Sequence, residues 1–146
     1  MPKTIFLVSC VKTKLNHSAK AKDLYISLWF QKARAYVEQR MKPGDKWFIL
    51  SALHCLVAPD QVLAPYEKRL RQNSSKGESE RWAGAVWDKL RPIIDNGDKV
   101  VFLAGIPYRE KLVNKITACG AFVEVPMDGL RSGEQGQWLK VQMDGH

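Results

Sequence analysis

Short apolar runs alternate along the chain with longer segments in which apolar residues recur every three or four positions. Four runs are typical of strands, because each is short, apolar and bounded by polar or turn residues. They are residues 4–9, 46–50, 98–105 and 121–126. Helical spacing is found in residues 23–41, 78–97 and 106–120, and in a shorter segment at 133–140.

Strands that alternate with helices of this length predict βαβ units and a mainly parallel sheet. Such crossovers are right-handed, so helices should cover both faces. We therefore expect an α/β fold, a three-layer sandwich with a mainly parallel four-stranded sheet. The chain of 146 residues fits one domain, residues 1–146, with a substantial core. Residues 73–79 are rich in Ser and Gly and predict a surface turn.

Two of the predicted helices have a defined apolar face. In the first, Asp23 lies near the start, and the apolar positions are Leu24, Leu28, Ala35 and Tyr36. In the second, Trp82, Val86 and Leu90 share one face. Gly120 is expected to end the helix at 106–120 as a C-terminal cap.

The net charge of +8 and the isoelectric point near 9.5 favour a polyanionic partner. Nucleic acid, DNA rather than RNA, is the first candidate; a soluble basic protein without such a partner is the alternative. The three cysteines form no even disulfide framework, which indicates a reduced, cytoplasmic setting. No segment approaches the length of a membrane span, so we expect no membrane partner.

Each predicted strand is followed by a loop with polar or reactive groups. The carboxyl ends of parallel strands meet at one edge of a sheet, and ligands bind there in open α/β folds. These loops therefore predict one shared site. Its residues are Ser9, Cys10, Lys12, Lys14, Ser51, His54, Tyr66, Gly105, Tyr108, Arg109, Asp128 and Gly129.

Three cations in these loops could bind phosphate. Lys12 and Lys14 would act as point charges, and a solvated basic loop is the alternative. Arg109 follows Gly105 at a predicted strand-to-helix turn, where a ligand can approach the backbone and a helix N-terminus favours an anion. A helix-surface arginine is the alternative reading.

The loop after the second strand carries three further candidates. Asp60, in a loop stiffened by prolines, could orient a water or stabilise a developing cation, or it could simply form a turn after proline. His54 and Cys55, with Cys10, suggest a thiolate nucleophile or a zinc site. Neither has a diagnostic spacing, and packing cysteines are common, so we expect no metal and no cofactor.

Several motifs together resemble a small family of uncharacterised bacterial and phage proteins. They are "SCVKTK", "ILSALHCLVAPDQVLAPYE", "FLAGIPYREKL" and "VPMDGLRSGEQGQWL", and the resemblance covers nearly the whole chain. The second motif is also distantly similar to the YaaA family of peroxide-stress proteins, which implies DNA binding and protection. That superfamily has been likened to DNA glycosylases, and related modules occur beside enzymes of 7-deazaguanine modification.

The chain departs from these families at two positions. Cys55 stands where the pattern has glycine, so we expect its backbone not to adopt positive φ and Cys55 not to be a general catalytic device. Asp60 lies one residue earlier than the corresponding acid in the YaaA family. This offset weakens the transfer of a catalytic role to Asp60.

Taken together, the charge, the shared edge and the resemblance predict a base-handling enzyme acting on nucleic acid, an N-glycosidase of a modified or damaged base. Asp60, His54 and Ser51 are the expected catalytic residues. A non-catalytic DNA-binding or protective module is one alternative, and a small-molecule nucleotide hydrolase or transferase is another. Substrate identity and oligomeric state are not predicted.

Overall fold

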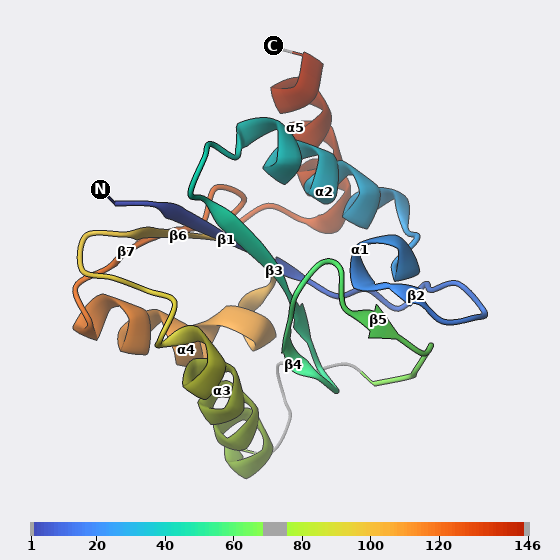
Figure 1. Cartoon of the computed structure of the whole chain (residues 1–146). Helices are drawn as coiled ribbons and strands as arrows, with labels where there is room; N and C mark the ends of the chain where they lie inside the picture. Colours follow the sequence, from blue (N-terminus) through green and yellow to red (C-terminus); the bar gives the residue numbers. More distant parts are fainter. Residues whose placement is uncertain (1, 69–75, 145–146) are drawn as a thin grey trace.

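The computed structural model describes residues 2–68 and 76–144 and has a mixed α/β fold around a five-stranded sheet (Figure 1). The strand order is β4-β3-β1-β6-β7. The strands are β1 (Thr4–Ser9), β3 (Lys46–Ser51), β4 (Cys55–Val57), β6 (Lys99–Leu103) and β7 (Phe122–Glu124). All neighbours are parallel except β3 and β4. The prediction of a mainly parallel sheet is confirmed.

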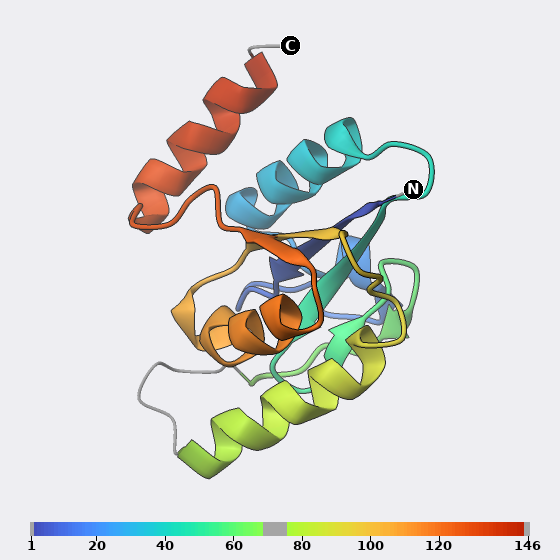
Figure 2. The same ribbon diagram turned by 90° about the vertical axis from the view of Figure 1, so that its left-hand side faces the viewer.

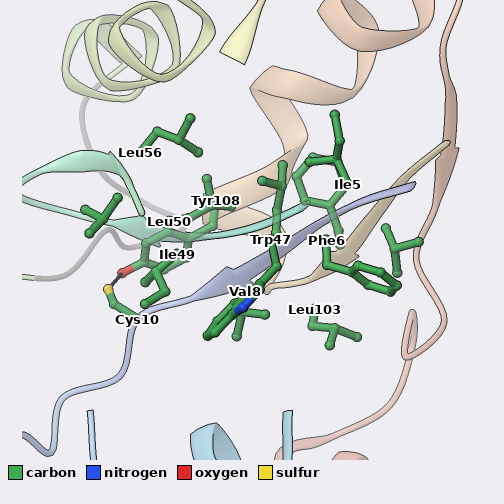
Figure 3. Close-up of a cluster of buried hydrophobic side chains, with 14 of the residues drawn as sticks. Ile5, Phe6, Val8, Cys10, Trp47, Ile49, Leu50, Leu56, Leu103 and Tyr108 are labelled. Atoms are coloured by element: carbon green, nitrogen blue, oxygen red, sulfur yellow. Dashed lines mark hydrogen bonds between the residues drawn. The ribbon is translucent and has the colours of Figure 1, made fainter. Parts of the chain in front are cut away.

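The central strand β1 is enclosed because its sequence is apolar on both faces. Ile5 pairs with Lys46 of β3 on one side and with Val100 of β6 on the other. Every residue from Ile5 to Ser9 is buried, as expected for a parallel strand covered on both faces. Figure 3 shows side chains from β1, β3 and β6 packed in this core.

Four longer helices flank the sheet (Figures 1 and 2). On one side, α2 (Leu28–Arg40) packs against α5 (Ser132–Asp144); on the other, α3 (Lys76–Leu90) packs against α4 (Ile106–Ala118). The chain moves from β1 to β3 in one direction and from β3 to β6 in the other. Right-handed connections therefore place α2 and α3 on opposite faces of the sheet.

Two short strands and one short helix lie beside the main sheet. β2 (Ala19–Lys20) pairs antiparallel with β5 (Val62–Leu63), and α1 (Ala21–Leu24) follows β2 directly. This small unit ties the long loop after β1 to the segment that follows β4. It thereby orders two segments that carry predicted site residues.

The prediction of four strands is wrong, because residues 55–57 form β4. Our pattern reading placed these residues in a loop. Leu56 and Val57 are buried, and they pair with Leu50 and Ile49 of β3. The strand was missed because the reversal from β3 takes only three residues and contains no glycine or proline signal.

The helix predicted at 23–41 is interrupted. The chain is extended at Tyr25, and α2 begins after Ser27, whose hydroxyl accepts a hydrogen bond from the Phe30 N–H at 3.1 Å. A serine in this position satisfies an N–H group that the first turn of a helix leaves unpaired. Because of the break, the side chains of α2 that face the sheet differ from those expected for one continuous helix. Leu28, for example, is 66% exposed rather than buried.

The other helices follow the pattern more closely. Trp82, Val86 and Leu90 of α3 are buried, as predicted. α4 ends just before Gly120, which has a φ of +92°. α5 (Ser132–Asp144) begins one residue before the predicted segment 133–140 and ends four residues after it. The predicted turn at 73–79 is wrong for 76–79, which begin α3, while 73–75 lie outside the described residues.

The topology has a switch point between β1 and β6. β1 is followed by α2 on one face, and its neighbour β6 is followed by α4 on the other face. The loops after these adjacent strands therefore diverge, and such a switch point is where open α/β sheets bind ligands. Over the described ranges, none of the helices has the length and apolar character needed to cross a membrane.

Candidate functional site

Cys10 and Tyr108 meet across the switch point. Cys10 follows β1 directly, and Tyr108 lies in the first turn of α4, after β6. The Cys10 Sγ and the Tyr108 hydroxyl oxygen are 3.5 Å apart, and both side chains are largely buried (Figure 3). The structure thus brings together two residues predicted for the site from positions 98 residues apart.

A chain of three hydroxyl groups continues the site toward β3. The Tyr66 hydroxyl lies 2.7 Å from the Ser51 hydroxyl and 2.5 Å from the Tyr25 hydroxyl. The Ser51 oxygen also accepts a hydrogen bond from the His54 N–H at 3.0 Å. Ser51 is fully buried, and it therefore anchors the loop after β3 from inside.

The phenols of this chain are held in their neutral form. Burial raises the pKa of Tyr25 to about 12, although its hydrogen bonds to Tyr66 and Ser51 oppose this. Burial also raises the pKa of Tyr66, and the nearby Cys10 raises it further. Both groups therefore stay protonated near neutral pH, where they can donate hydrogen bonds but cannot act as bases.

Lys14 covers the hydroxyl chain. Its Nζ lies 4.5 Å from the centroid of the Tyr66 ring and 5.6 Å from that of Tyr25, within the range of cation–π contacts. Burial lowers the pKa of Lys14, while the nearby Cys10 and Glu67 oppose this shift. We name the group formed by Cys10, Lys14, Tyr25, Ser51, His54, Tyr66 and Tyr108 the hydroxyl cluster.

His54 and Cys55 lie at the reversal between β3 and β4. The His54 ring packs edge-on against Tyr66 with centroids 5.2 Å apart. Our expectation for Cys55 is wrong, because its φ is 64°. The three-residue reversal requires a left-handed residue, and cysteine adopts it at an energetic cost that glycine would avoid.

A pocket of about 330 Å³ lies at the same carboxyl edge of the sheet, where the loop after β6 faces the loop after β7. Arg109 follows Tyr108 in α4 and lines this pocket. Its Nε donates to the Ala104 carbonyl at 3.1 Å, and its Nη2 donates to the Asp128 carboxylate at 3.0 Å. The pocket also includes Gly105 and Gly129, so four predicted site residues are gathered here.

The remaining predicted residues are more peripheral. Ser9 is buried at the end of β1, and Lys12 is exposed, with its carbonyl accepting a hydrogen bond from Lys14 at 3.1 Å. The Asp60 carboxylate is 69% exposed and lies 2.9 Å from Lys22. The hydrogen bond and charge of Lys22 lower the pKa of Asp60. Asp60 is therefore placed in a surface ion pair, and its catalytic role stays a prediction.

Sequence reasoning missed two members of the site's inner wall. Tyr25 was assigned to the interior of a helix, although it lies in the extended break before α2. Trp82 was expected only to fill the core, yet its indole N–H donates to the Ser51 carbonyl at 2.8 Å. Its ring also packs edge-on against Tyr108 at 5.6 Å. Only a helix start recognised at Ser27 could have indicated from the sequence that Tyr25 lies outside a helix.

Among residues 2–68 and 76–144, no group of three or more His, Cys, Asp or Glu side chains is arranged to hold a metal ion. The zinc ligands considered from the sequence, His54, Cys55 and Cys10, therefore do not form such a group within the described ranges.

Comparison with protein families gives a match over residues 5–141 to the model of a family of unknown function, DUF6884. The chain belongs to this family. The DUF6884 match runs from β1 into α5 and therefore includes both the hydroxyl cluster and the pocket. No curated protein and no solved structure matches the chain, so the similarity to the YaaA family stays a prediction.

Proposed function

We propose that the protein binds a nucleotide unit of nucleic acid, DNA rather than RNA, at the carboxyl edge of its sheet and hydrolyses the N-glycosidic bond of a modified or damaged base. The observation that carries this proposal is that the hydroxyl cluster and the 330 Å³ pocket both lie at the carboxyl edge of the sheet, on the two sides of the switch point. Tyr108 belongs to the cluster, and the next residue of α4, Arg109, lines the pocket.

The net charge of +8 supports a nucleic-acid substrate, since lysine and arginine compensate the phosphate backbone. Lys12 and Lys14 follow β1 at the carboxyl edge of the sheet, and we assign phosphate binding to them. A base turned out of its stack would reach the recessed groups at the edge.

In the proposed reaction, the bond between C1′ of the sugar and the base nitrogen breaks, and the base leaves with the electron pair. His54 supplies the proton that the departing base takes up. A water molecule adds to C1′ and loses a proton to solvent. Ser51 and Tyr66 act as positioning residues, because they hold the His54 backbone and pack against its ring.

A non-catalytic nucleic-acid-binding module is the second candidate, and the placement of Asp60 favours it. The Asp60 carboxylate is engaged by Lys22 at the surface, and the neutral hydroxyls of the cluster provide no ionised base. This candidate predicts salt-sensitive DNA binding that weakens in Lys12→Ala, with no base released.

The test is incubation of the protein with duplex and single-stranded DNA that carries modified or damaged bases, followed by assay of free base and abasic sites. We expect release by the wild type and a loss of about 100-fold or more in His54→Ala, because a general acid typically contributes about 10²–10⁴-fold. Lys115→Ala, on the exposed side of α4, is the control and should keep full activity. Binding without release across the substrates would overturn the reaction and leave the binding module.

A further inference from the structure

The pocket beside α4 has the size and lining of a site for a single base. Ligand pockets in proteins start at about 300 Å³, and this one measures about 330 Å³. Its apolar lining comes from Phe102, Ile106, Val125, Met127 and Leu130. Its charged groups are Arg109 and Asp128, which stand side by side. A flat apolar ring with a polar edge matches this combination.

Arg109 is held in a fixed orientation. Only 16% of its side chain is exposed, and its Nε is bound to the Ala104 carbonyl. A guanidinium has five N–H groups in one plane, and the bonds to Ala104 and Asp128 use two of them. The group is therefore a preset donor to acceptor atoms of a ligand.

Asp128 presents the complementary acceptor. Its side chain is 68% exposed, and Arg109 engages one of its two carboxylate oxygens. An ionised carboxylate has about four lone-pair positions, so it can still accept two parallel N–H bonds. The negative charge also makes this pocket a poor place for phosphate, and it gives Arg109 a different role from the one predicted.

We propose that this pocket binds a guanine-type base, with Arg109 donating to the O6/N7 edge and Asp128 accepting from N1–H and the 2-amino group. This inference rests on the proposed binding of a nucleotide unit at this edge and names the base that the pocket takes. Guanine places two adjacent donors next to an acceptor, which matches a carboxylate beside a guanidinium. Adenine and cytosine would each turn a ring nitrogen lone pair toward Asp128, and thymine has a single ring donor between two carbonyls.

The test is equilibrium binding of single-stranded oligonucleotides that differ only in one central base: guanine, hypoxanthine, xanthine, adenine, cytosine or thymine. We expect guanine to bind tightest. Hypoxanthine lacks the 2-amino donor and should bind about ten-fold more weakly, the scale of one hydrogen bond to a charged group.

Two variants separate recognition from a general loss of structure. Asp128→Asn offers one acceptor and one donor, which fit N1–H and the C2 carbonyl of xanthine, so the preference should move from guanine to xanthine. Arg109→Lys keeps the charge but loses the planar fork, and we expect about ten-fold weaker binding of guanine. Asp88→Asn, on an exposed position of α3, is the matched control and should leave the preference unchanged.

Each outcome decides the inference. A preference for guanine that Asp128→Asn moves to xanthine supports it. Equal binding of all bases, or a guanine preference unchanged in Asp128→Asn, overturns it. If modified DNA still loses its base in either of those cases, the proposed function stands and only the base assignment fails. If no oligonucleotide binds and no base is released, both fail.

Discussion

The two ends of the parallel sheet both gather buried polar groups, but these groups have different partners. At the amino end, Asp98 is 1% exposed and accepts hydrogen bonds from the backbone N–H groups of Lys3 and Asp95. Asp45 accepts in the same way from Thr4 and Lys42. These carboxylates pin the starts of strands and the turns that precede them.

At the carboxyl end, several side chains bond to one another. The Tyr66 hydroxyl lies between those of Ser51 and Tyr25, and Cys10 lies against Tyr108. A group that fixes the backbone is costly to remove, whereas a group that bonds to other side chains can exchange its partner for a ligand. We therefore infer that the polar groups at the amino end stabilise the fold and that those at the carboxyl end bind a ligand.

The largest effect on stability is expected for Asp98→Ala. This change leaves two backbone N–H groups without their acceptor and Lys3 without its partner at 2.6 Å. Leaving a buried donor without its acceptor costs about 1–3 kcal/mol, and this change leaves two N–H groups in that state. Urea unfolding measures the difference. Asp95→Ala is the control, because Asp95 contacts the same lysine but is 80% exposed and should cost under about 1 kcal/mol.

The same carboxylate should make stability fall in acid. Burial raises the pKa of Asp98, but the bonds from Lys3 and Asp95 outweigh it, and the net shift is downward from 3.8. A carboxyl with a lowered folded pKa stabilises the fold above its unfolded pKa, and this contribution is lost as pH falls through the folded value. Below about pH 4, the wild type should therefore lose stability more steeply than Asp98→Asn. If the free energies of unfolding of the wild type and Asp98→Asn fell in parallel as the pH is lowered, the lowered pKa of Asp98 would be contradicted.

At the carboxyl end, Ser51→Ala should cost less. The change removes the acceptor of the His54 N–H and one partner of Tyr66. Leaving a buried donor unsatisfied costs about 1–3 kcal/mol. Ser18→Ala, at an exposed position, is the control for the loss of a hydroxyl and should have no measurable effect. A cost for Ser51→Ala as large as that of Asp98→Ala would remove the distinction between the two ends.

The smallest effect, and one of opposite sign, is expected for Cys55→Gly. The φ of 64° strains a cysteine but not a glycine. Strain of this kind costs about 1–3 kcal/mol, and the extra freedom of an unfolded glycine offsets about 0.4–1 kcal/mol. We expect a gain near 1 kcal/mol in thermal or urea unfolding. Cys55→Ala keeps the Cβ and should show no such gain, which separates strain from loss of the thiol.

The central strands and the switch-point residues could be predicted from sequence because their signals are local. β1 has its predicted bounds of 4–9, since its apolar run is flanked by polar residues on both sides. Cys10 and Tyr108 could be placed together because parallel strands deliver the loops that follow them to one edge.

The rest depends on contacts between distant segments. Asp98 follows the turn at Asn96 and Gly97 and was predicted only as the first residue of a strand, while its partner Lys3 lies 95 positions away. Tyr25 acquires its role only through the loop that carries Tyr66, 41 positions away. No local sequence pattern indicates contacts between segments this far apart, so the roles of Asp98 and Tyr25 were not predicted.

The most direct test of the account is to map a bound single-stranded DNA on the protein by amide NMR shifts. The account predicts shifts at the carboxyl end, at Lys14, Tyr66 and Arg109, and none at the amino end around Asp45 and Asp98. Shifts centred on the amino end, or spread evenly over the basic surface, would contradict it.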